Sequence, residues 1–176
     1  MSLPAGFTTS TDTALPLHAV GKSGYAAWRQ AQPATVQAWL DAQRFDGSAG
    51  SVQSWANADG RVAGAVLGVE DRLDPYAWAH APRALPAGDW QIAGDIDADA
   101  ARALQLGWGL GRYRFARYKA STPPAARLAA EAFDAETFDL LAACVRVRDL
   151  VNTPTEHMGP DELEAVAREL AQAHGA

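Results

Sequence analysis

Residues 51–69 read SVQSWANADGRVAGAVLGV, and this stretch decides the fold class. Runs of β-branched, aromatic and small apolar residues lie on both sides of Asn57-Ala58-Asp59-Gly60, where Gly60 supplies the positive φ that such a turn needs. The pattern predicts a β-hairpin with strands over residues 51–55 and 61–69. The second strand is apolar on both faces, which is typical of a strand in the middle of a covered sheet.

Outside the hairpin, strand and helix patterns alternate along the chain. Strands are expected over residues 15–20, 90–96 and 126–130, and helices over residues 33–43, 76–80 and 97–111. Asp97 is the expected N-cap of the last of these helices, and Trp90 and Trp108 are expected in the core. Residues 1–13 are small and polar and are expected to be loosely ordered, and Pro123-Pro124 is expected to break the chain. This alternation predicts an α/β fold with its elements in layers.

The composition is that of an ordinary globular chain, and 176 residues suffice for one domain, or for one domain plus a small piece of another. A formal net charge of −6 argues against attraction of the whole surface to nucleic acid or anionic lipid. One cysteine, Cys144, excludes an intrachain disulfide and the Cys-rich zinc patterns. The N-terminus does not resemble a signal peptide, and no window reaches the roughly 18 apolar residues of a membrane span. A cytoplasmic protein without a membrane partner is therefore expected.

The C-terminal third predicts two helices. Asp134 is the expected cap of a long helix to about Val151, with a broad apolar stripe formed by Leu140, Leu141, Cys144, Val145, Val147 and Val151. After a loop over residues 152–159, Pro160 opens a second helix with acidic residues in its first turn. The apolar face of this helix, formed by Leu163, Val166, Ala167 and Leu170, needs a partner. We therefore expect the chain to be a piece of a longer protein.

Two glycine motifs fail as nucleotide-binding signals. Gly21-Lys22-Ser23 is half of a P-loop, but Pro16 stands where the loop needs its first glycine, so an ordinary turn is expected. The run Gly107-Trp108-Gly109-Leu110-Gly111 has the wrong spacing for a dinucleotide fingerprint and follows a helix rather than a strand. Gly107 and Gly111, four residues apart, are expected to let another element pack closely.

The segment 112–119 carries four positive charges and three aromatic rings. Such a mixture could stack on and neutralise a nucleic-acid single strand. The favoured interpretation is that Leu104, Trp108, Gly111, Phe115 and Tyr118 continue one helical face, with the rings in the core and the basic groups in solvent. Nucleic acid is therefore not expected as a partner.

No catalytic, cofactor-binding or metal-binding residue is expected in this chain. His18, His80, His157 and His174 have no metal-site spacing, and Glu156 beside His157 is an isolated pair. A two-metal site needs several clustered carboxylates, and among Asp95, Asp97 and Asp99 the middle residue is better explained as a helix cap. Cys144 lies on the apolar stripe of a helix and is expected to be a small core residue.

Two stretches resemble the leucyl (cytosol) aminopeptidase family. The first is residues 106–115, LGWGLGRYRF, with Tyr118-Lys119 after it, and the second and more specific is residues 147–163, VRDLVNTPTEHMGPDEL. In that family the second stretch marks the passage from the N-terminal domain to the catalytic domain. The resemblance covers about residues 104–172. The family's metal-binding and catalytic strings, Gly-Lys-Gly, Asp-Thr-Gly-Gly and Asn-Thr-Asp-Ala-Glu-Gly-Arg, do not occur here, so no catalytic residue is carried over.

The resemblance implies a three-layer, macro-domain-like α/β unit with a central mixed sheet flanked by helices. It divides the chain into an N-terminal domain (residues 1–133), a connecting helix (134–151), and a linker with the first helix of an absent catalytic domain (152–176). The parent enzyme would remove N-terminal residues from peptides with water held between two divalent metals, Mn or Zn. Its partners would be its own catalytic domain, peptide substrates and further copies in a homo-oligomer.

A binding module is the alternative function. In this hypothesis the macro-like fold itself binds an ADP-ribose-type ligand or a nucleic acid. It requires a ligand-sized pocket lined by glycine loops and by N–H groups that face phosphate, whereas the aminopeptidase interpretation predicts none.

Overall fold

The expected hairpin is present in the computed structural model, which describes residues 3–120 and 125–175. Strand β3 (Val52–Ala56) pairs antiparallel with β4 (Val62–Gly68). The side-chain oxygen of Asn57 accepts hydrogen bonds from the backbone N–H groups of Asp59 and Arg61, both at 3.0 Å. Gly60 has a φ of 77°, so the residue at this position of the turn is glycine for a steric reason.

The hairpin forms one edge of a six-stranded mixed sheet with the order β1-β6-β5-β2-β4-β3. The remaining strands are β1 (Phe7–Thr8), β2 (Leu15–Val20), β5 (Gly88–Ile92) and β6 (Ala126–Ala129). All neighbouring pairs are parallel except β3 and β4. The predicted α/β class with a central mixed sheet is therefore confirmed. The expected break at Pro123-Pro124 lies outside the described residues.

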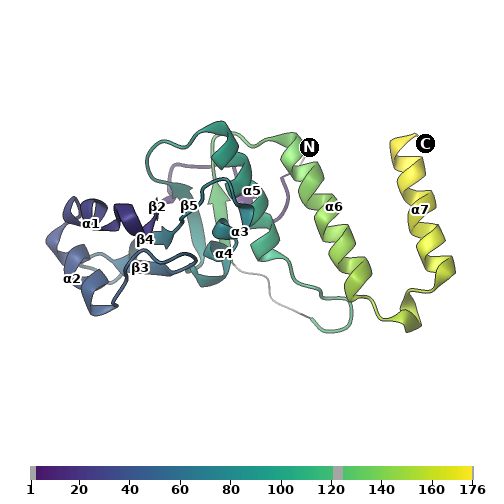
Figure 1. Cartoon of the computed structure of the whole chain (residues 1–176), viewed down its shortest axis with the longest axis horizontal. Coiled ribbons are helices and arrows are strands. Elements are labelled where there is room, and N and C mark those ends of the chain that lie inside the picture. The colour runs from purple at the N-terminus through teal and green to yellow at the C-terminus, as the bar shows by residue number, and fades with distance from the viewer. Residues whose placement is uncertain (1–2, 121–124, 176) are drawn as a thin grey trace.

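Helices cover the sheet on both faces. Val66 and Leu67 are consecutive on β4 and therefore point to opposite faces, and both are fully buried. Val66 packs with Val36 and Leu40 of α2 (Ala34–Ala42), on the side that also carries α1 (Lys22–Gln30). Leu67 belongs to the larger core on the other face, beneath α3 (Pro75–Trp78), α4 (Ala81–Ala84) and α5 (Ala98–Arg112). Figure 1 shows α1 and α2 on one side of the strands and α5 on the other.

Helix α5 is the most buried helix of the described chain, because its glycines let neighbouring segments approach it closely. A Cβ atom added at Gly107 would lie 2.0 Å from the carbonyl oxygen of Pro75, and one at Gly111 would lie 2.2 Å from that of Ala79. The predicted role of these glycines in close packing is therefore confirmed. Trp90 and Trp108 are both fully buried, as expected.

Two helices follow the sheet domain. Helix α6 (Ala135–Asn152) begins at the expected N-cap Asp134 and packs beside α5. Helix α7 (Pro160–His174) begins after Gly159, whose N–H donates to the Glu162 carboxylate at 2.9 Å. Figure 1 shows α7 at the far end of the molecule from α1 and α2. Both helices expose side chains from their predicted apolar faces: Leu140, Val147, Val151, Leu163 and Leu170.

Three local expectations were wrong. Residues 1–13 are not uniformly loose, because Phe7 lies in β1 and is buried against the rings of Phe133 and Phe138. The strand expected over residues 90–96 ends at Ile92, and Gly94 has a φ of 88°, which no extended strand adopts. Helix α5 ends at Arg112, so Phe115 and Tyr118 do not continue its face, and Tyr118 is 50% exposed.

We expect Gly107→Ala to lower the free energy of unfolding by about 1–3 kcal/mol, because the new methyl group overpacks against the backbone of Pro75. Gly24→Ala in α1 is the matched control, since a Cβ there has only Val20 near it, at 3.9 Å. That change should stabilise the chain by up to about 1 kcal/mol through helix propensity. Urea denaturation followed by tryptophan fluorescence measures both effects, and equal stability of the two variants would contradict the packing role of Gly107.

Candidate functional site

A pocket of about 450 Å³ opens at the carboxyl ends of β5 and β6, against the N-terminal half of α5. Its apolar wall includes Ile92, Leu104, Leu128 and Phe133. Ligands of open α/β sheets bind at this end of the strands, and the volume falls in the range of small-molecule sites. We therefore take this pocket as the candidate site on the basis of its position at the carboxyl ends of the strands.

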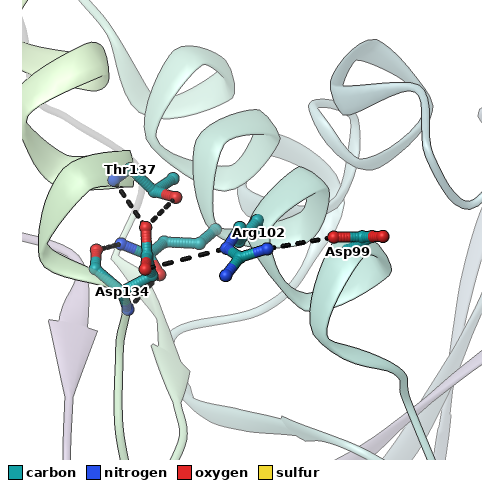
Figure 2. A network of polar contacts seen from close by, with 5 residues as sticks. Asp99, Arg102, Asp134 and Thr137 are labelled. Carbon is teal, nitrogen blue, oxygen red and sulfur yellow. Dashed lines mark hydrogen bonds and ion pairs between the residues drawn. The ribbon is translucent and has the colours of Figure 1, made fainter.

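The polar groups at the pocket edge form a network that the chain itself satisfies (Figure 2). The Asp134 carboxylate accepts hydrogen bonds from the backbone N–H and the hydroxyl of Thr137, at 2.7 and 2.6 Å. Arg102 lies between two carboxylates: its guanidinium is 3.7 Å from that of Asp134 and 3.0 Å from that of Asp99. The hydrogen bonds from Thr137, followed by the charge of Arg102, hold the pKa of Asp134 below its ordinary value.

Gln105 completes this network from inside the core. Its side-chain N–H donates to the carbonyl of Asp134 at 2.7 Å, and its side-chain oxygen accepts from the N–H of Asp134 at 2.9 Å. The amide therefore clamps the start of α6 to the middle of α5, and its buried polar atoms are paired. The network as a whole has the geometry of a joint between two helices.

The pocket is a poor electrostatic match for a pyrophosphate. The carboxylate of Asp97 accepts from the N–H of Ala100 at 2.9 Å and so occupies the N-terminus of α5. Asp134 and Glu131 add carboxylates to the wall, and Gly94 is the one glycine among the described lining residues. Glycine loops with phosphate-facing N–H groups, which the binding-module alternative requires, are not found in this part of the described chain.

The P-loop-like segment is also occupied by the chain's own acids. The backbone N–H of Lys22 donates to the Glu70 carboxylate at 2.7 Å, so the N-terminus of α1 already has an anion. The Lys22 ammonium is 3.4 Å from Asp46. These contacts support the interpretation of Gly21-Lys22-Ser23 as an ordinary turn.

The four histidines lie in different parts of the chain and have different neighbours. His18 accepts a hydrogen bond from the indole N–H of Trp28 at 3.2 Å, and burial lowers its pKa. His157 stacks on Tyr118, with 2.9 Å between its Nδ1 and the tyrosine hydroxyl. The His80 ring lies beside Gly50, and His174 is in the last turn of α7. Across residues 3–120 and 125–175, no group of three or more His, Cys, Asp or Glu side chains has the arrangement to hold a metal ion.

Comparison with known families identifies the chain. The family described as M17 aminopeptidase, N-terminal domain, matches residues 15–131. Because this match spans more than half of the chain, the protein belongs to that family. The strands, both helical layers and the pocket described above all fall within or beside the matched residues.

Solved structures agree with this assignment. The cytosol aminopeptidase of Coxiella burnetii is 29% identical, with a TM-score of 0.83 over 93% of this chain and 36% of that enzyme. The bottromycin maturation enzyme BotP is 25% identical, with a TM-score of 0.65 over 93% of this chain and 38% of that enzyme. A tomato leucine aminopeptidase mutant, at 15% identity and a TM-score of 0.66, shares the fold over 96% of this chain and 41% of its own. The chain thus spans less than half of the length of each of these proteins.

A search of the curated proteins found no match. Among the residues that the structure describes, no helix is both long enough and apolar enough to cross a membrane. A second structure of BotP, 24% identical to this chain, was solved in complex with Mn.

We expect Asp134→Asn to lower the melting temperature at pH 7, because the amide keeps the helix cap but loses the charge that Thr137 and Arg102 stabilise. The pKa of Asp134 is lowered in the folded chain, so its contribution is present above the ordinary value of 3.8 and is lost as pH falls through the lowered value. The difference from the unchanged chain should therefore close in acid. Thermal melts from pH 7 to pH 2.5 measure it.

Asp139→Asn is the control, since it removes the same charge from an exposed position of α6. A difference for Asp134→Asn that stays constant across the whole pH range would contradict the role given to its carboxylate.

Proposed function

We propose that the chain is the N-terminal, non-catalytic part of a leucyl aminopeptidase, a two-metal exopeptidase that removes N-terminal residues from peptides. The observation that carries the proposal is the family match over residues 15–131, supported by the TM-score of 0.83 with the Coxiella burnetii cytosol aminopeptidase. In the parent enzyme the metals, Mn or Zn, and the catalytic groups belong to the remaining chain. The parent is a cytoplasmic homo-oligomer in this proposal.

The proposed division of the chain is 1–133 for the N-terminal domain, 134–151 for the connecting helix, and 152–176 for the linker and first helix of the catalytic domain. The start of α6 supports the first boundary, because Gln105 and Asp134 fix that point to the sheet domain. Beyond it, Val147 and Val151 are 58% and 78% exposed. A run of exposed apolar side chains on a helix is typical of a surface that another domain covers.

The groove between α6 and α7 supports the same division. It has a volume of about 410 Å³, and its apolar walls include Val145, Leu150, Met158 and Val166. An ion pair between Arg146 and Glu169, at 3.2 Å, links the two helices across it. Exposed pairs of this kind contribute little, so packing against the catalytic domain would position α7 in the parent. The role of this part of the enzyme is architectural: it supports the catalytic domain and shapes access and assembly.

The binding-module alternative rests on the pocket of about 450 Å³ beside α5. Volume favours a small ligand there, but the carboxylates of Asp97, Glu131 and Asp134 disfavour the pyrophosphate of an ADP-ribose-type ligand. The macro-like binding role is therefore the second candidate.

The first test is enzymatic. We expect no hydrolysis of leucine-p-nitroanilide by the purified 176-residue chain in the presence of manganese, and well under one bound zinc or manganese per chain after dialysis. The physical reason is that a two-metal centre needs clustered carboxylates, which the described residues do not provide. Metal-dependent turnover at a rate near that of the parent enzyme would contradict the proposal, as would one metal ion bound per chain.

The second test concerns the exposed helices. We expect the chain to dimerise with increasing concentration and a version lacking residues 155–176 to remain a folded monomer, because α7 exposes Leu163 and Leu170. Sedimentation velocity of both versions, with circular dichroism as the folding control, measures this. Leu163→Gln should weaken dimerisation without deleting the helix. If the shortened chain unfolds, or if both versions are monomers at every concentration, the boundary at residue 152 is wrong.

A further inference from the structure

Three arginine side chains from different elements meet at the carboxyl end of α5. Arg83 of α4 donates to the carbonyl of Gly111 at 2.7 Å, and Arg148 of α6 donates to the carbonyl of Leu110 at 3.0 Å. Arg114, in the segment that follows α5, donates to the carbonyl of Tyr113 at 2.9 Å. Their three acceptors lie within four consecutive residues, so the guanidinium groups share one small region of the surface.

This cluster, named here the arginine triad, has no counter-ion in the described chain. Within residues 3–120 and 125–175, no carboxylate lies within 4.0 Å of the three guanidinium groups. By contrast, Arg102 has two carboxylate partners at such distances, and Arg127 and Arg146 have one each. The nearby acid Asp149 is engaged by the hydroxyl of Tyr113 at 2.7 Å. Partial burial lowers the pKa of Arg83, and the positive charges of Arg114 and Arg148 lower it further.

The negative end of α5 offsets only part of this charge, because a helix terminus is equivalent to about half an elementary charge. The triad would therefore gain from an anion with more than one negative charge. Each guanidinium has five N–H donors, and the carbonyl bonds use one of them in each arginine. Donors remain available to such an anion.

The triad is also held in place before any ligand binds. The Arg148 guanidinium lies over the Tyr113 ring, 5.4 Å from its centroid. The Tyr113 hydroxyl is itself fixed between Asp149 and the side-chain N–H of Asn152, at 2.7 and 3.0 Å. Since these contacts are made within the chain, the entropy of ordering the side chains is not lost again on binding.

We propose that the arginine triad at the carboxyl end of α5 is a binding site for a phosphate group. A phosphate group carries up to two negative charges and several acceptor oxygens that match arginine forks, whereas a carboxylate would leave most of the positive charge unpaired. The ring of Tyr113 already contacts Arg148, and that of Tyr118 already contacts His157 and Arg117, so the proposal rests on the charge of the triad rather than on base stacking. A free phosphate compound carries this charge on one group, whereas a nucleic-acid backbone carries one negative charge on each of its successive phosphodiesters. Both present phosphate oxygens and more than one negative charge to the triad.

The test uses the 176-residue chain and three probes: inorganic phosphate, pyrophosphate and a fluorescent thymidine oligonucleotide. Calorimetry and fluorescence anisotropy follow binding at pH 7.5 with ionic strength held constant by sodium chloride. Arg114→Gln is the informative variant, because among the described residues the Arg114 side chain hydrogen-bonds only to the neighbouring Tyr113, so its loss should leave the fold unchanged. Arg61→Gln is the control, since it removes the same charge from the exposed β3–β4 turn.

We expect Arg114→Gln to weaken binding about tenfold, as for the loss of a charge-assisted hydrogen bond, and Arg61→Gln to leave it within about twofold. Such an effect on phosphate or pyrophosphate identifies a free phosphate compound, and an effect on the oligonucleotide alone identifies a nucleic-acid backbone. If melting shows that Arg114→Gln is poorly folded, Arg114→Lys, which keeps the charge but not the fork, replaces it with the same expected direction. No saturable binding of any probe, or equal weakening by the variants at positions 61 and 114, overturns the proposal.

Discussion

Close approach to α5 is the constraint on which the rest of the fold depends. Each of three glycines on this helix lies against a neighbouring residue. Gly107 faces the backbone of Pro75, Gly111 faces that of Ala79, and Gly109 faces the side chain of Leu141 on α6. A Cβ at any of them would lie 2.0 to 2.2 Å from the neighbouring atom. With side chains in these positions, α3 and α6 would have to move outward, and the core beneath α5 would be opened to water.

The same packing explains how α6 can be both part of the domain and a connection out of it. Along one side α6 is fixed at both ends, by the Gln105 amide at Asp134 and by Arg148 at the carbonyl of Leu110. Its other side exposes Leu140, Val147 and Val151. A helix anchored in this way transmits its orientation to whatever follows it, which suits the junction between the N-terminal and catalytic parts in the proposed parent enzyme.

Local signals decided which parts of the fold were predictable from the sequence. The β3–β4 hairpin, α2 and the caps at Asp97 and Asp134 were predicted, because turn residues, periodicity and N-caps act over a few residues. Strand β1 was missed, since Phe7 is held by rings more than a hundred positions away and two residues have no periodicity. The end of α5 was missed for a similar reason: the apolar spacing continues through Phe115 and Tyr118, while the arginines that bind the last carbonyls come from other elements.

The wrongly predicted end of α5 also explains why the arginine triad could not be predicted from the sequence. Basic residues after α5 were visible as a run, but the charge that matters there is assembled in space, by Arg83 and Arg148 as much as by Arg114. Glycines at positions 107, 109 and 111 have no side chains to separate the elements, so α4 and α6 approach α5 closely enough for their arginines to reach its final carbonyls. The glycines that make the core compact therefore also bring positive charge together at one point of an acidic chain.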